Sequence, residues 1–177
     1  FPRHFANTIV LPDGRVLVTG GETRANNDPA LGVYAAEAWN PATGSWTTLA
    51  SARIFRGYHS QTSLLTNGTV LSTGGGNPGP VQRTGEVFYP PYLFRTVNGV
   101  AQLAPRPQMI GISGRSHASG AQLQVDMAGN APVAQLVLIG LSVGTHSFNS
   151  GQRRIPLAFS QEDIRLTATL PSANLAP

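Results

Sequence analysis

The chain has 177 residues, of which 41% are hydrophobic, and a formal net charge of +4. This composition is sufficient for a buried core, and no apolar run approaches the roughly 20 residues that cross a bilayer, so we expect no membrane span. All twelve basic residues are arginine, spread along the chain, which argues against the clustered basic surface of a nucleic-acid-binding protein. There is no cysteine, so the chain offers no disulfide, thiolate metal ligand or cysteine nucleophile.

The N-terminal half of the chain contains an internal repeat. Residues 8–21 have the sequence TIVLPDGRVLVTGG, and residues 62–75 have the sequence TSLLTNGTVLSTGG. Aspartate-glycine and asparagine-glycine fall at the same place in the two copies, and such dipeptides favour a two-residue turn with positive φ. Each copy is therefore predicted to be a β-hairpin whose second strand ends in a glycine pair.

Residues 36–46, between the two copies, predict a third strand, a turn and an outer fourth strand. Four strands in a unit of about 50 residues are typical of a kelch-type propeller blade; the alternative is another antiparallel sheet with similar turns. Residues 85–94 are predicted to continue the second unit, and residues 98–107 to form a linker. Two blades cannot close a ring, so we expect further blades of the same polypeptide upstream.

The C-terminal part predicts a small β-sandwich. Residues 122–127 alternate between polar and apolar side chains, and residues 134–141 form an apolar run with the length of a buried strand. An immunoglobulin-like sandwich takes about 100 residues, more than this part supplies. The predicted fold is therefore all-β, with about two kelch blades in residues 1–104 and an incomplete immunoglobulin-like sandwich in residues 105–177, truncated at both ends.

Tyr58, His59 and His146 are the candidate metal ligands, because imidazole nitrogen and phenolate oxygen suit Cu(II). Neighbours on a regular strand point to opposite faces, so Tyr58 and His59 could share a metal only where a strand begins or is distorted. Nothing in the spacing alone brings His146 to the same place. Taken one at a time, each of these residues is better explained by packing and hydrogen bonding than by a metal role.

Two motifs with their flanks, RGYHS at residues 56–60 and THSFN at residues 145–149, resemble the C-terminal part of the galactose oxidase and glyoxal oxidase family, the radical copper oxidases. The resemblance covers nearly all of the chain. It implies that Tyr58 is an axial copper ligand and a general base, and that His59 and His146 are further copper ligands. It also implies an immunoglobulin-like C-terminal domain with a loop that carries His146 up the propeller axis.

The resemblance implies oxidation of a primary alcohol, an aldehyde or a carbohydrate by O2, with release of H2O2, by a secreted protein. The first residues of the chain show no secretory signal. The family's Cys-Tyr radical cofactor cannot lie in a chain without cysteine, so we expect it in preceding blades and expect this chain alone to be inactive. The alternative is a non-catalytic kelch propeller that binds carbohydrate or protein. Arg153 and Arg154 are predicted to brace the loop after His146 by hydrogen bonds.

Overall fold

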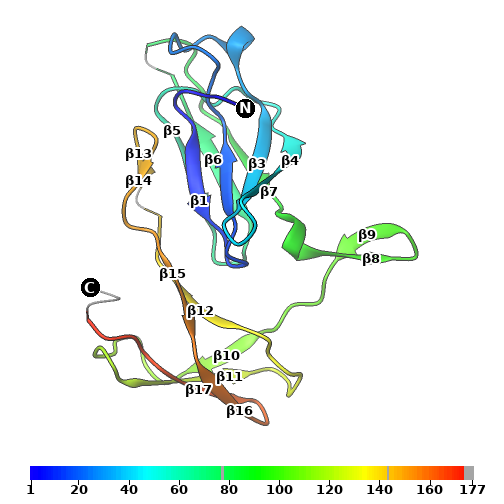
Figure 1. Cartoon of the computed structure of the whole chain (residues 1–177), viewed down its shortest axis with the longest axis vertical. Coiled ribbons are helices and arrows are strands. Elements are labelled where there is room, and N and C mark those ends of the chain that lie inside the picture. Colours follow the sequence, from blue (N-terminus) through cyan, green and yellow to red (C-terminus); the bar gives the residue numbers. More distant parts are fainter. Residues whose placement is uncertain (77, 143, 174–177) are drawn as a thin grey trace. The chain divides into compact units, whose positions relative to one another are not determined.

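The computed structural model describes residues 1–76, 78–142 and 144–173, which form β-strands and two short 3₁₀ helices (Figure 1). Contacts divide the chain into two compact units: one holds residues 1–102 and 139–154, and the other holds residues 103–138 and those from 155 onward. The all-β class is confirmed, and the described strands form no closed propeller ring. The domain boundary between residues 104 and 105 stays a prediction.

The first repeat copy lies in a four-stranded antiparallel sheet. Its strands follow one another in the order β1 (Asn7–Val10), β2 (Val16–Thr19), β3 (Ala35–Asn40) and β4 (Ser45–Ser51), with the helix η1 (Pro29–Leu31) between β2 and β3. Trp39 on β3 lies opposite Trp46 on β4, with ring centroids 6.5 Å apart. The third and fourth strands predicted from residues 36–46 are therefore present.

The second repeat copy lies in a three-stranded antiparallel sheet. Its strands are β5 (Ser60–Leu64), β6 (Val70–Gly74) and β7 (Gly85–Phe88), in that order, and the helix η2 (Pro91–Leu93) follows. The described part of the chain thus gives this copy three strands, where four per unit are predicted. The predicted continuation beyond residue 85 is one strand and one helical turn.

The two hairpin turns have three-residue loops, so the predicted two-residue turn is wrong. In the first copy the N–H of Leu11 donates to the carbonyl of Arg15 at 2.8 Å, and three residues lie between them. Only the last of these, Gly14, has positive φ, at 92°. The second copy repeats the pattern with Gly68 at 78°. A type I turn followed by one left-handed residue is the usual three-residue hairpin loop, which explains why the glycine alone adopts positive φ.

A further hairpin follows η2, where a linker is predicted for residues 98–107. Strands β8 (Phe94–Val97) and β9 (Val100–Leu103) pair with each other. Asn98 and Gly99 join them with φ values of 50° and 79°. Positive φ at both residues is the signature of a type I′ turn, for which Asn-Gly is the preferred dipeptide. The linker prediction is therefore wrong for residues 98–103.

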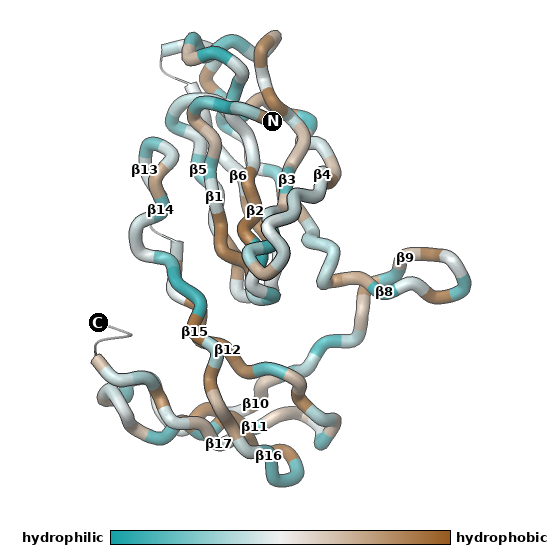
Figure 2. Tube along the Cα trace, viewed as in Figure 1, coloured by the Kyte–Doolittle hydropathy of each residue, from teal (hydrophilic) through white to brown (hydrophobic). Residues whose placement is uncertain are grey.

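Apolar side chains of the repeated hairpins and of β3 form the core of the first unit: Ile9, Leu11, Leu17, Ala36 and Val70. Figure 2 shows this apolar character along β1 and β2. Buried polar contacts join the two sheets, because Asn7 Nδ2 donates to Ser60 Oγ at 2.8 Å and the hydroxyls of Thr19 and Thr62 lie 2.9 Å apart. These contacts hold the starts of β1 and β5 side by side.

The second unit contains a four-stranded antiparallel sheet and a separate strand pair. The sheet has the order β10 (Met109–Ile112), β11 (Gln122–Met127), β17 (Arg165–Thr169) and β16 (Phe159–Glu162), and β12 (Leu136–Ile139) pairs with β15 (Arg154–Leu157). Its core consists of Leu123, Val125, Met127, Leu157, Leu166 and Ala168. The first three alternate along β11, as the sequence predicts. Within the residues that the structure describes, no helix has the length and apolarity to cross a membrane.

Candidate metal centre

Tyr58 and His59 lie in a turn directly before β5, so the divergence of neighbours on a regular strand does not apply to them. His59 has a φ of 64°, in the left-handed region that non-glycine residues seldom adopt. This backbone turn brings the two rings to the same side of the chain, with centroids 3.8 Å apart and an interplanar angle of 31°. Strained backbone of this kind is concentrated at functional sites.

His146 reaches the same place from a small hairpin in the segment 139–154. The hairpin is formed by β13 (Gly144–Thr145) and β14 (Phe148–Asn149), and its two turn residues, His146 and Ser147, have φ values of 49° and 69°. β14 contacts β1, and β13 contacts β5. The ring centroid of His146 lies 4.9 Å from that of His59 and 5.7 Å from that of Tyr58.

The nitrogens of the two histidines face each other at the tip of this cluster. Nε2 of His59 and Nε2 of His146 are 3.2 Å apart. On the far side of each ring, Nδ1 of His59 lies 3.2 Å from the carbonyl oxygen of Gly76, and Nδ1 of His146 lies 2.7 Å from the hydroxyl of Thr145. A carbonyl only accepts, so Nδ1 of His59 donates to it. The Nε2 lone pair of His59 is therefore directed toward His146.

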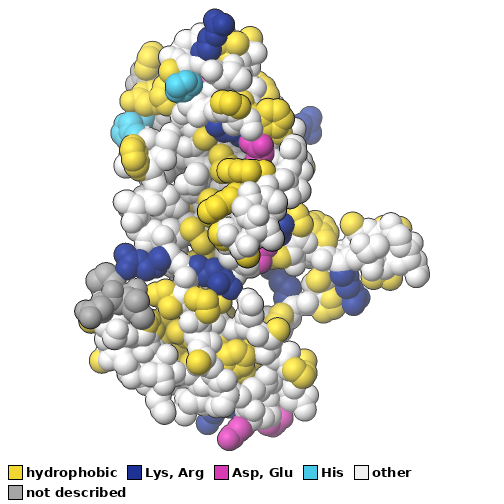
Figure 3. All heavy atoms as spheres, in the orientation of Figure 1, with side chains coloured by type: hydrophobic (Ala, Val, Ile, Leu, Met, Phe, Trp, Pro, Cys, Tyr) yellow, Lys and Arg dark blue, Asp and Glu magenta, His cyan; other side chains and the backbone are white. Residues whose placement is uncertain are grey.

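This arrangement fits a bound cation. Two nitrogens that bind one metal ion at about 2.0 to 2.1 Å and at a right angle would lie about 2.9 Å apart, close to the 3.2 Å observed. Both imidazoles are exposed, and Figure 3 shows histidine side chains open to solvent on the surface of the first unit. The described residues contain no group of three histidine, cysteine, aspartate or glutamate side chains placed to hold a metal, so this set differs in having two histidines and a tyrosine. Nitrogen and phenol donors together suit Cu(II).

A buried carboxylate braces the Tyr58 turn. Glu22 is fully buried, and its two oxygens accept from the backbone N–H groups of Asn27 at 2.7 Å and Asp28 at 2.8 Å. Asn27 in turn accepts from the N–H of Tyr58 at 3.1 Å and donates to the carbonyl oxygen of Pro78. Nothing in the sequence marks Glu22 or Asn27 as part of the site, since a single acid near a strand end carries no signal of burial.

Arg56 anchors the segment immediately before the Tyr58 turn. Its guanidinium is buried and donates to the carbonyl oxygen of Gly74 at 3.0 Å and to the hydroxyl of Thr84 at 3.3 Å, and it lies 3.6 Å from the carboxylate of Glu86. Burial lowers the pKa of Arg56, and the Glu86 carboxylate opposes that effect. The predicted motif at residues 56–60 thus contains a structural residue beside the two candidate ligands.

Phe5 is an aromatic neighbour of Tyr58 that no motif in the sequence predicts. Its ring centroid lies 4.9 Å from that of Tyr58, and its φ is 59°. The predicted brace after His146 is present at Arg154, whose Nε donates to the carbonyl oxygen of Pro12 at 2.6 Å. The three candidate ligands therefore converge, with neighbours that fix their backbone.

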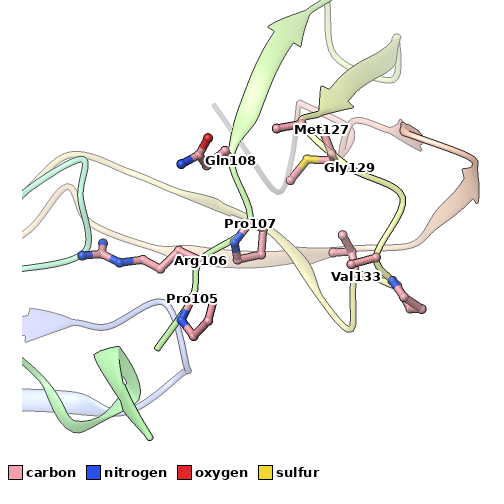
Figure 4. Close-up of a pocket in the computed structure, with 10 residues that line it drawn as sticks. Pro105, Arg106, Pro107, Gln108, Met127, Gly129 and Val133 are labelled. Carbon is pink, nitrogen blue, oxygen red and sulfur yellow. The ribbon is translucent and has the colours of Figure 1, made fainter. Parts of the chain in front are cut away.

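The second unit contains a separate pocket of about 400 Å³. Its wall is formed by residues 105–108 together with Met127, Gly129 and Val133 (Figure 4). The lining is mostly apolar and includes one titratable side chain, that of Arg106. It offers neither a nucleophile nor a general base, so the cluster around Tyr58 is the better candidate for chemistry.

Known proteins similar to this chain include oxidases of the galactose oxidase and glyoxal oxidase type. Residues 106–177 match the family model "Galactose oxidase-like, Early set domain". The chain is 32% identical to a galactose oxidase of Gibberella zeae over 164 aligned residues. The aligned region is 90% of this chain and 23% of that protein. It is 27% identical to an aldehyde oxidase GLOX of Vitis pseudoreticulata over 203 aligned positions. The aligned region is all of this chain and 37% of that protein.

A solved structure shows the same likeness in three dimensions. A fungal alcohol oxidase of the AA5 family, solved in complex with copper, superposes with a TM-score of 0.85 and 32% identity over 97% of this chain and 36% of that one. The chain thus spans between 23% and 37% of the length of these relatives. The predicted resemblance to the galactose oxidase and glyoxal oxidase family is confirmed, and the C-terminal part is a galactose oxidase-like Early set domain.

Proposed function

We propose that Tyr58, His59 and His146 are copper ligands of an oxidase that converts primary alcohols or aldehydes with O2, releasing H2O2. The observation that carries this proposal is the approach of the two Nε2 atoms to 3.2 Å beside the Tyr58 ring. At that distance the two nitrogens can share a proton in a hydrogen bond, or bind one cation through both lone pairs. The oxidase activity of the relatives supports the choice of a redox-active cation.

The chain's own residues take defined parts in this chemistry. For an alcohol, the overall reaction removes one C–H hydrogen and the O–H hydrogen from the CH2OH group and delivers both to O2. Tyr58, as the phenolate that bound copper would stabilise, would take the hydroxyl proton at its oxygen. His59 and His146 would hold copper through Nε2, because Nδ1 of His59 contacts the Gly76 carbonyl and Nδ1 of His146 contacts the Thr145 hydroxyl. Copper, when bound, supplies one-electron redox chemistry.

The chain cannot supply the whole cofactor. It has no cysteine, so the Cys-Tyr group does not fit any position within these residues, and we derive no step through it. We propose that this group lies in preceding blades of the same polypeptide, and that residues 1–177 alone do not oxidise alcohols. We also propose that the two sheets of the first unit are kelch-type propeller blades and that the protein is secreted.

The test is a peroxide assay and a Cu(II) titration on the full-length protein. We expect wild type to bind Cu(II) and to release H2O2 from a primary alcohol or an aldehyde. His59→Ala and His146→Ala should each lose tight Cu(II) binding, whereas Tyr58→Phe should keep the ring stack but lose peroxide release. The exposed Gln102→Ala is the control. Cu(II) binding that survives both histidine changes would refute the site, and carbohydrate binding without peroxide would favour the non-catalytic propeller.

A further inference from the structure

The outer edge of β1 is covered by side chains in place of a strand. On an edge strand, the backbone groups of alternate residues point away from the sheet and need partners. On β1 and just beyond it these groups include the carbonyl of Thr8, the N–H and carbonyl of Val10, and the carbonyl of Pro12. Asn149, Gln152 and Arg154 satisfy them. The segment after His146 is therefore attached to β1 by a ladder of three side chains.

Gln152 is the centre of this ladder. Its Oε1 accepts from the N–H of Val10 at 2.8 Å, and its Nε2 donates to the carbonyl oxygen of Val10 at 3.1 Å. A side-chain amide thereby makes both hydrogen bonds that a neighbouring strand would make. Only one orientation of the amide satisfies both partners, so the position of Gln152 on the edge is fixed.

Asn149 connects Gln152 to the hairpin of His146. Its Nδ2 donates to Oε1 of Gln152 at 2.8 Å and to the carbonyl oxygen of Thr8 at 3.0 Å. Asn149 belongs to β14 and pairs with Gly144, so it closes the two-residue strands whose turn carries His146. Figure 1 shows β13 and β14 beside the sheet that contains β1. A hairpin this short is not stable by itself, so its position depends on these contacts.

We propose that Gln152 is a positioning residue, which sets the place of His146 relative to His59 through Asn149 and Val10. The expected effect of Gln152 on copper binding rests on the proposed function. Its effect on the position of the His146 hairpin does not depend on copper. Groups that orient metal ligands from behind typically change metal affinity by about 10- to 100-fold when removed. Gln152 itself contacts neither the imidazoles nor Tyr58 in the described hydrogen bonds.

The first experiment is hydrogen exchange on the metal-free full-length protein. Gln152→Ala should raise the exchange rate of the Val10 amide and of the amides in residues 144–149. Gln152→Glu keeps the acceptor for the Val10 N–H but loses the donor to its carbonyl, so we expect intermediate protection. Gln102→Ala, an exposed glutamine of β9, should leave these rates unchanged. Unchanged exchange in Gln152→Ala would overturn the inference whether or not the protein binds copper.

The second experiment is a Cu(II) titration in two backgrounds. Gln152→Ala should weaken Cu(II) binding by about 10- to 100-fold in the otherwise wild-type protein, and should cause no further loss when His146 is already replaced by alanine. An equal loss in both backgrounds would show a general defect in folding and overturn the positioning role. If wild type binds no Cu(II), the proposed function fails, and hydrogen exchange alone decides on Gln152.

Discussion

Glu22 offers a direct test of how the Tyr58 turn is held. The side chain is 0% exposed, and each of its carboxylate oxygens accepts from one backbone N–H, at 2.7 Å from Asn27 and 2.8 Å from Asp28. Asn27 then accepts from the N–H of Tyr58. Glu22→Gln keeps the shape of the side chain but replaces one acceptor with an NH2 group that faces a backbone N–H.

The expected cost follows from these contacts. A hydrogen bond to a charged group contributes about 1.5 to 3 kcal/mol, and a buried N–H left without an acceptor costs about 1 to 3 kcal/mol. The two free-energy costs partly describe the same broken contact, so their sum overestimates the effect. We expect Glu22→Gln to lower the free energy of unfolding by about 2 to 4 kcal/mol.

Urea unfolding followed by tryptophan fluorescence measures this change, because Trp39 and Trp46 both lie in the first unit. The matched control is Glu162→Gln, since Glu162 is exposed on β16 and should change stability by less than about 0.5 kcal/mol. If Glu22→Gln also stays within about 0.5 kcal/mol of wild type, then Glu22 does not hold this loop as argued.

Two further predictions concern a close approach and a surface ion pair. Gly57→Ala places a Cβ inside the van der Waals radius of Asn27 Oδ1, so thermal unfolding should show a loss of stability of about 1 to 3 kcal/mol. The control Gly129→Ala, with open space around its Cβ, should be neutral. Equal effects of the two substitutions would contradict the clash. The hydrogen bond from Arg165 lowers the pKa of Asp126 below its ordinary value of 3.8. The pair therefore stabilises the protein above that value and loses its effect as the pH falls through the lower pKa. Melting temperatures should fall less between pH 6 and pH 2 in Asp126→Asn than in wild type, and parallel falls would count against the pair.

Local patterns in the sequence predict the hairpins but not the site. The two repeat copies combine β-branched runs with a turn dipeptide, and such signals act between neighbours, so they predict strands without knowledge of the fold. The same rule would have found the β8–β9 hairpin, because Asn98-Gly99 is the strongest short-range hairpin signal. The turn length was mispredicted, since the dipeptide alone does not distinguish a two-residue from a three-residue loop.

The candidate ligands required a resemblance, because the physical signal is non-local. His59 and His146 are 87 positions apart, and no periodicity links them. The positive φ of His59 brings the rings of Tyr58 and His59 together. Because His59 is not a glycine, the sequence gives no sign of this conformation, which depends on the surrounding contacts. Gln152 has no signal in the sequence, because its pairing with Val10 depends on which edge of the sheet stays open.

The segment 139–154 also has a consequence for biosynthesis. It begins at the end of β12 and finishes at the start of β15, and those strands pair with each other. At about 5 to 20 residues per second, a ribosome would add the 87 positions from His59 to His146 in about 4 to 17 s. During that interval the nascent chain carries Tyr58 and His59 without the third donor. In the proposed copper site, the complete donor set therefore exists only after His146 has been synthesised, so tight metal capture follows that point in synthesis.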